Sequence, residues 1–290
     1  MPMPTRDQLL ALAAELRRLK GEGLRGVNVS EENLAGLRAA VAVEVAGNAP
    51  SSADRPVVER TPAALPAIPV PAPSVQLPAG DKQVRWSALR ELVLNHPVCR
   101  THVRPGKKIV LGVGSLDARI FFCGEAPGAE EEVQGEPFVG PAGQLLTRMI
   151  QGMGLRRDEV YIGNIMNWRP ELPVNSDGVQ YGNRPPTPEE MNFCLPFLRA
   201  QLEVVQPQII VALGATAAGG LLGPGTFKTL GEIRGRWHEF AGRPVMVTYH
   251  PSYILRNQSN RSKRAIWEDL LKVMEKVGLP VSTKQRGYFL

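Results

Sequence analysis

The stretch "RIFFCGEAPGAEEEVQGEPFVGPAGQLLTRMIQGMG" (residues 119–154) decides the expected fold. It begins with a short aromatic and β-branched run, residues 119–123, which is typical of a buried strand. A bent loop rich in glycine and proline follows. Residues 142–153 then carry apolar side chains at helical spacing, and Gly154 is a stop signal. The stretch therefore predicts a strand, a shaped loop and a helix.

The same alternation continues along the chain. Three more apolar runs lie at residues 159–165, 208–213 and 244–249. Between two of them, residues 188–205 form a helical pattern that opens with Thr187 as cap and Glu190 as capping-box acid. Strands separated by helices predict a central, mostly parallel, four-stranded sheet with helices on both faces, a three-layer α/β/α fold.

The domain organisation follows from composition. The chain has 290 residues, of which 43% are hydrophobic, enough for one principal core. Amphipathic helices are expected at 5–20 and 30–46, and a Pro/Ala-rich stretch follows them. We therefore predict an N-terminal helical segment over 1–47, a linker over 48–80 and a globular domain over 81–290. The sequence leaves open whether the leading helices bind a partner or pack on the domain.

Charge and hydropathy indicate the cellular compartment and the kind of partner. No apolar run approaches the roughly 18 residues of a membrane span, and the N-terminus lacks the order of a signal peptide, so a cytoplasmic protein is expected. Three cysteines far apart do not suggest disulfides. Residues 1–80 hold 8 basic and 8 acidic residues, so the whole net charge of +6 lies on 81–290. That excess favours a polyanionic partner.

The strand ends carry the polar candidates. In parallel sheets ligands bind at the carboxyl ends of the strands. Glu125, Asn164 and His250 follow three of the predicted strands and should converge there. Each has a simpler reading: a helix cap for Glu125, an Asx turn for Asn164, a structural loop histidine for His250, and a core position for nearby Phe138. An acid, an amide and an imidazole around one bent loop together predict an active site.

Five motifs resemble one known family. In chain order they are "GEAPGAEEEVQGEPFVGPAGQLL", "NIMNWRP", "NRPPTPEE", "VALGATA" and "HPSYILR". Over residues 85–275 the chain is similar to family 4 uracil-DNA glycosylases. The resemblance implies a monofunctional DNA-repair enzyme, acting as a monomer, that flips uracil out of single- or double-stranded DNA and hydrolyses its N-glycosidic bond. The alternative is a protein that binds or crosslinks uracil or abasic DNA without turnover.

The resemblance also implies residue roles. Phe138 would stack on uracil, and Asn164 would accept from N3–H and donate to O4, a pattern that cytosine reverses. Glu131 would block the C5 methyl of thymine. The other implied positions are Glu125 and His250 for catalysis, Ala126 and Gly128 for uracil binding, and Ser252, Tyr253 and Arg256 in a DNA-contacting loop. Glu130, Glu132 and Glu136 are expected to face solvent.

The chain departs from the family at its metal site. Most members hold a [4Fe–4S] cluster on four cysteines. Here His96 stands in the first position and Trp168 in the third, which leaves only Cys99 and Cys194 as thiolates. A cluster on His96, Cys99 and Cys194 stays open, but the bulky indole favours a protein without cofactor. Cys123 is expected in the core, and an insert at 171–182 leaves the range of substrate bases open.

Overall fold

The computed structural model describes residues 72–174 and 180–290, and these contain a six-stranded sheet with the order β1-β3-β2-β4-β6-β5. The strands are β1 (Val113–Gly114), β2 (Ile120–Gly124), β3 (Tyr161–Asn164), β4 (Ile209–Leu213), β5 (Trp237–Phe240) and β6 (Arg243–Thr248). The helices are α3 (Lys82–Asn95), α4 (Pro97–Thr101), α5 (Ala129–Gln134), α6 (Pro141–Gly152), α7 (Pro188–Val205), α8 (Ala215–Leu222), α9 (Leu230–Ile233), α10 (Pro251–Arg256), α11 (Asn260–Lys276) and α12 (Thr283–Arg286), with a 3₁₀ turn at Arg157–Glu159.

The four central strands confirm the predicted parallel sheet. β3, β2, β4 and β6 are neighbours and run parallel, with Gly124 opposite Asn164 and Leu213 opposite Thr248 in register. Two antiparallel edge strands were not predicted, because β1 has only two residues and β5 alternates exposed and half-buried residues before Phe240. The carboxyl ends of the parallel strands therefore meet along one edge, as expected.

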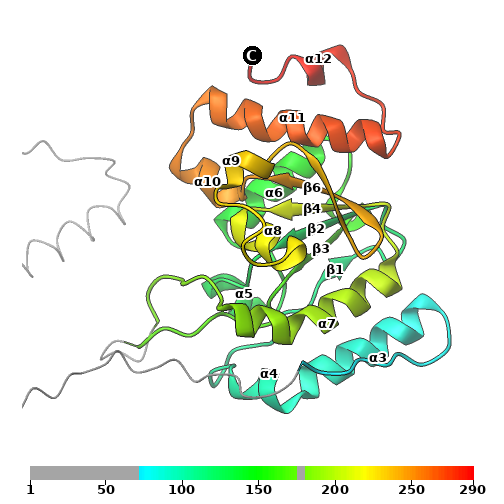
Figure 1. Cartoon of the computed structure of the whole chain (residues 1–290), viewed down its shortest axis with the longest axis vertical. Helices are drawn as coiled ribbons and strands as arrows, with labels where there is room; N and C mark the ends of the chain where they lie inside the picture. Colours follow the sequence, from blue (N-terminus) through cyan, green and yellow to red (C-terminus); the bar gives the residue numbers. More distant parts are fainter. Residues whose placement is uncertain (1–71, 175–179) are drawn as a thin grey trace, which may run out of the picture. The chain divides into compact units, whose positions relative to one another are not determined.

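Helices cover both faces of the sheet (Figure 1). One face packs on α6 and α11, where Phe122 joins Leu146 and Leu270 in one buried cluster. The other face packs on α7 and α8, and it receives Phe121 and Cys123, because neighbouring strand residues point to opposite sides. Cys123 is fully buried, which confirms the expected core position.

A third apolar cluster lies between α3 and α7, on the far side of α7 from the sheet (Figure 1). Leu89 and Val93 of α3 contribute to it, and Val75 and Leu77 pack against it. The Asp81 side chain caps α3 by accepting from the Val84 amide at 2.8 Å. The predicted helices at 5–20 and 30–46 lie outside the described residues.

The beginnings of α7 and α10 differ in how well they match the predictions. α7 begins as expected: Thr187 Oγ1 accepts from the Glu190 amide at 3.2 Å, and Glu190 accepts from the Thr187 amide at 2.7 Å. The segment after His250 was expected to be a loop, and this was wrong, because Pro251–Arg256 forms α10 with His250 as its N-cap. Over the described part of the chain, no helix is long and apolar enough to cross a membrane.

Candidate active site

A cavity of about 720 Å³ opens at the carboxyl ends of the parallel strands. It is lined by the predicted trio Glu125, Asn164 and His250 together with Phe138. Glu125 follows β2, Asn164 ends β3 and His250 follows β6, so residues far apart in sequence meet because their strands share one sheet edge. The predicted convergence is confirmed.

Asn164 and Phe138 approach each other over Gly124. A Cβ at Gly124 would lie 2.4 Å from Asn164 Oδ1 and 2.5 Å from the Phe138 ring, so only glycine fits between them. Asn164 is 5% exposed, and its Oδ1 has no hydrogen-bond partner among the described residues. An orphaned buried acceptor costs about 1–3 kcal/mol, which a ligand N–H could offset.

Phe138 adopts an unusual backbone conformation. Its φ is +55°, in the left-handed region that bulky residues rarely occupy. The carbonyl of Phe138 also passes so close to Gly143 that a Cβ there would lie 1.8 Å away. The ring is 6% exposed, lines the cavity and lies 5.6 Å from the His250 ring at 31°. Strain of this kind clusters at functional sites, so the backbone supports a role beyond core packing.

His250 is held as a neutral imidazole with one free donor. Its Nδ1 accepts from the Ser252 amide at 3.1 Å and lies 2.8 Å from Ser252 Oγ. The ring proton therefore belongs on Nε2, which has no hydrogen-bond acceptor among the described residues. Burial, aided by the charge of Arg256, lowers the pKa of His250 to about 4. At neutral pH the site thus offers an uncharged N–H donor.

Glu125 occupies a partly buried position at the end of β2. Burial raises the pKa of Glu125, and a hydrogen bond with Thr216 opposes that rise. The Glu125 carbonyl accepts from the Met166 amide at 3.0 Å, which ties the loop after β2 to the chain beyond β3. The backbone that carries the carboxylate is therefore anchored beside the cavity.

Glu131 braces the loop that carries Phe138. Its Oε1 accepts from the amides of Val139 and Gly140 at 3.0 and 3.1 Å, and its Oε2 accepts from the Gly128 amide at 3.1 Å. The side chain is 9% exposed and lines the cavity. Its carboxylate thus organises backbone, a role that the sequence reasoning missed.

The expectation that Glu132 faces solvent was wrong, whereas Glu130 and Glu136 are exposed as expected. Glu132 is 8% exposed and pairs with Arg169 at 2.9 Å and with Lys107 at 3.4 Å. A single turn of α5 carries Glu130–Glu132, and the helix turns the last two inward.

Three polar cavity-lining residues were not singled out from the sequence. Arg169, Asn183 and Arg184 belong to the quoted motifs but carried no recognisable catalytic pattern. Arg169 Nε donates to Asn183 Oδ1 at 2.9 Å, and Arg184 forms a bidentate pair with Glu190 at 2.7 Å. They close the wall of the cavity that borders the insert.

The remaining predicted positions divide into two groups. The cavity lining includes the predicted residues Ala126, Gly128, Ser252 and Arg256. Tyr253 does not line it: its ring stacks on Tyr249 at 4.5 Å and 17°, and its hydroxyl accepts from Asn257 at 3.0 Å. Tyr253 of α10 packs against the apolar cluster and lies outside the cavity lining, and its DNA contact stays a prediction.

The positions of the family's iron–sulfur ligands form an apolar, aromatic core here. Trp168 is 1% exposed, stacks on His102 at 4.9 Å and 8°, and lies 5.9 Å from the Phe193 ring. Cys99 and Cys194 are buried in the same cluster, and burial raises the pKa of the Cys99 thiol to about 12.

Of the side chains in the described ranges, no three His, Cys, Asp or Glu are grouped to hold a metal ion. His96 packs edge-on against Phe193, and its Nδ1 is buried without a partner in this part of the chain. The residues present do not fit a cluster that takes four cysteine thiolates.

Comparison with known proteins agrees with this fold and site. The family model of the uracil DNA glycosylase superfamily matches residues 111–271. The chain is 43% identical to the type-4 uracil-DNA glycosylase of Thermotoga maritima over 183 residues, 63% of this chain and 89% of that protein.

Two further relatives point the same way. The type-4 uracil-DNA glycosylase of Archaeoglobus fulgidus is 43% identical over 50% of this chain and 71% of its own length. The type-5 uracil-DNA glycosylase of Pyrobaculum aerophilum is 30% identical over 57% of this chain and 75% of its own length. The fold is thus that of the uracil-DNA glycosylase superfamily. Within it, the chain belongs to the type-4 uracil-DNA glycosylases.

Proposed function

We propose that this protein is a DNA-repair glycosylase that removes uracil from DNA and leaves an abasic site. The observation that carries the proposal is the meeting of Glu125, Asn164 and His250 on one cavity at the carboxyl ends of parallel strands. The base must leave the duplex to enter such a cavity, and the cost of flipping, a few kcal/mol, has to be recovered by contacts with the base.

Asn164 is proposed to read the uracil edge. Its buried Oδ1 would accept from N3–H, and its Nδ2 would donate to O4. Cytosine has an acceptor at N3 and a donor at its amino group, so both contacts would be lost. A site built for such hydrogen bonds rejects the mismatched base by up to about 10⁴-fold or more.

Phe138 is proposed to stack on the flipped base. Its ring is held at the cavity by a backbone that is already in the required, unfavourable conformation. The loop that carries Phe138 is therefore already ordered before the base arrives. The conformational entropy of ordering it is lost during folding and not during binding, which favours binding of the base. Glu131, on the same cavity wall, would exclude the thymine methyl by occupying space with a carboxylate fixed by three amides.

His250 and Glu125 are proposed to stabilise the two charges that develop in the reaction. When the bond between C1′ and N1 breaks, its electron pair passes to uracil, and the sugar becomes cationic. The neutral His250 would donate from Nε2 to uracil O2, where negative charge gathers. The Glu125 carboxylate would stabilise the sugar cation and orient the water that adds to C1′, whose proton is then lost to Glu125 or solvent.

Ser252 and Arg256 are proposed to hold the DNA backbone beside the flipped nucleotide. Both line the cavity from α10. Ser252 already fixes His250 through its amide, so a phosphate contact there would position base and backbone together. Because one chain supplies every proposed group, we propose a monomer that works in the cytoplasm on chromosomal DNA.

We propose that the reaction needs no iron–sulfur cluster. The packing of Trp168 between His102 and Phe193 supports this, since the indole fills space at the third ligand position. Protein purified without oxygen should lack stoichiometric iron and sulfide and show no broad visible absorption band. Stoichiometric iron and sulfide would contradict the proposal.

The function is tested with oligonucleotides that carry one uracil, in single- and double-stranded form, followed by hot alkali. Alkali cleaves the strand at an abasic site, so cleavage reports excision. Matched oligonucleotides with thymine or cytosine are the controls and should stay intact. Binding without alkali-sensitive product would favour a non-turnover protein, and a covalent adduct that survives denaturation would favour a crosslinking one; either result overturns the proposal.

A further inference from the structure

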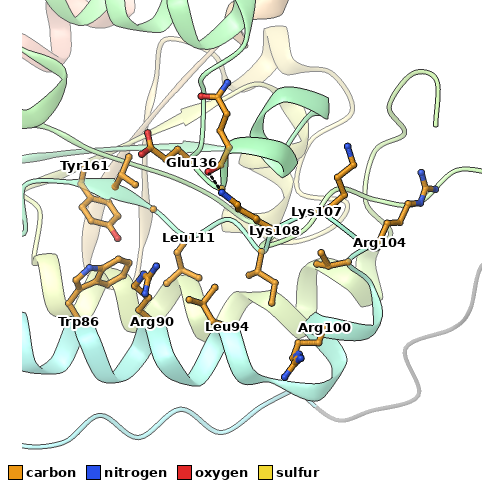
Figure 2. Close-up of a pocket in the computed structure, with 17 residues that line it drawn as sticks. Trp86, Arg90, Leu94, Arg100, Arg104, Lys107, Lys108, Leu111, Glu136 and Tyr161 are labelled. Carbon is orange, nitrogen blue, oxygen red and sulfur yellow. Dashed lines mark hydrogen bonds between the residues drawn. The ribbon is translucent and has the colours of Figure 1, made fainter. Parts of the chain in front are cut away.

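A second cavity adjoins the end of α5, whereas the candidate active site adjoins its beginning. Its volume is about 820 Å³, and it is bounded by α3, by the chain from Arg100 to Gly114 and by the turn after α5 (Figure 2). No proposed catalytic residue lines it. We call it the basic groove.

The groove has an unbalanced charge. Its lining includes the cations Arg90, Arg100, Arg104, Lys107 and Lys108. Of the described lining residues, only Glu136 is acidic. Arg90 and Arg100 are exposed, and neither has a hydrogen-bond acceptor or ion-pair partner in the described ranges. Guanidinium groups left without partners around one hollow favour an anionic ligand with several charges.

The groove also has an apolar wall. Trp86 and Leu94 of α3 and Leu111 of the facing chain line it, and Trp86 is partly exposed (Figure 2). The Trp86 ring is held edge-on by Tyr161, with ring centroids 5.9 Å apart. Cationic grooves with an aromatic residue are the usual receptor for unpaired nucleic acid, where cations contact phosphates and aromatic rings contact bases.

The two cavities share one thin wall. Gln134 and Glu136 line the basic groove, whereas Glu131 and Phe138 line the candidate active site. Glu136 and Phe138 are two residues apart, at most about 7 Å along the chain. α5 and the turn after it carry residues of both linings. A path of about 10 Å, the diameter of one helix, corresponds to about three stacked nucleotides at 3.4 Å each.

The Glu132 carboxylate forms an ion pair with a residue of each lining. Glu132 contacts Lys107, which lines the groove, and Arg169, which lines the candidate active site. Because the two linings lie so close together along the chain, one DNA strand could occupy both cavities at once.

We propose that the basic groove binds the unpaired DNA strand that carries the target base, about three nucleotides from the flipped position. This inference rests on the proposed function. The N-terminal leader is a less suitable occupant, because residues 1–80 carry 8 basic and 8 acidic residues and so have no net negative charge to offer. A DNA strand supplies one negative charge per nucleotide.

The test is the charge-reversed variant Arg90→Glu/Arg100→Glu in the full chain. The matched control is Lys276→Glu/Lys284→Glu, with the same change in charge on α11 and α12, beyond the opposite face of the sheet from α3 (Figure 1). Fluorescence anisotropy measures binding of a labelled 20-nucleotide oligothymidine without uracil. The variant should bind at least about tenfold more weakly and show a shallower salt dependence, by about 0.7 per lost phosphate contact, while the control changes little.

Kinetics then separate the groove from the active site. On a 20-nucleotide uracil strand the variant should show a raised KM with unchanged kcat. On a trinucleotide with central uracil, too short to reach the groove, both constants should match the wild type. The milder Arg90→Gln/Arg100→Gln variant should show the same pattern with a smaller effect, and thermal melting should report an intact fold.

Unchanged affinity for oligothymidine in both the glutamate and the glutamine variants would overturn the inference. The groove would then bind the N-terminal leader or another ligand. Equal losses on the trinucleotide and the long strand would also overturn it, because the arginines would then serve the active site itself. The anisotropy test needs no turnover. If the wild type excised no uracil, the proposed function would fail while the groove could still be judged.

Discussion

Replacing Glu131 by glutamine should destabilise the protein although the side chain keeps its size. In the native protein, Oε1 of Glu131 accepts hydrogen bonds from the amides of Val139 and Gly140, and Oε2 accepts one from the amide of Gly128. The single side-chain oxygen of glutamine can still accept the two hydrogen bonds from the amides of Val139 and Gly140. Its NH₂ group must then face the Gly128 N–H, donor against donor.

The expected cost is that of one charge-assisted hydrogen bond at a nearly buried position, about 1.5–3 kcal/mol. For a domain of this size, each kcal/mol shifts the Tm by about 2–4 °C, so the Tm should fall by about 3–12 °C. Activity should fall as well, since the braced amides follow Phe138 directly, and a displacement of about 1 Å can cost about 10²-fold in rate. Rejection of thymine should persist, because the shape near C5 is retained.

Urea unfolding gives the stability, and single-turnover excision of uracil gives the rate. The matched control is Glu130→Gln, which alters an exposed carboxylate on the same cavity and helix and should change stability by less than about 0.5 kcal/mol. If Glu131→Gln unfolds at the wild-type urea concentration, the carboxylate does not brace the loop. If it is stable but excises thymine, the side chain acts through its charge and not its shape.

Further predictions concern three other residues. Asn164→Asp should lower uracil excision by about 10³-fold or more without loss of fold, because it replaces the donor to O4 by an acceptor; wild-type single-turnover rates would reject the assignment. His250→Ala should lower kcat by about 10²–10³-fold, since it removes the donor to O2. Because the folded pKa of His250, about 4, lies below its ordinary value of 6.5, the unfolded chain binds the proton first, so the free energy of unfolding should decrease as pH falls from 6.5 to about 4. His250→Asn, which keeps a capping side chain, should weaken that pH dependence, and an unaltered pH profile would contradict the reasoning. Trp168→Ala should cost about 3–5 kcal/mol in urea unfolding, because it empties a fully packed site; a cost below 1 kcal/mol would show that the indole does not hold this core together.

The central fold was predictable because its signals are local and strong. The four parallel strands are apolar runs bounded by loops, and α7 carries its own cap in Thr187 and Glu190. β1 and β5 gave no such signal, since one has two residues and the other is half-exposed. Edge strands depend on a neighbour for their definition more than on their own composition.

The candidate site divides in the same way. Position at a strand end was enough to bring Glu125, Asn164 and His250 together. Which glutamates of α5 turn inward was not readable, because that depends on how the loop brings the amides of residues 139–140 back to α5 and on Arg169, which is distant in sequence. The helix at Pro251–Arg256 was missed for a related reason, since its cap is the side chain of His250, whose role as N-cap was not readable from the sequence.

The missing side chain at Gly124 has a consequence for how this site can change over evolution. A single added methyl would press on Asn164, which is proposed to choose the base, and on Phe138, which is proposed to hold it. A substitution at Gly124 therefore cannot move Asn164 without also moving Phe138. Base selection and base stacking are therefore coupled at Gly124, and new base preferences should arise from another part of the cavity lining, where Arg169, Gly182 and Asn183 lie.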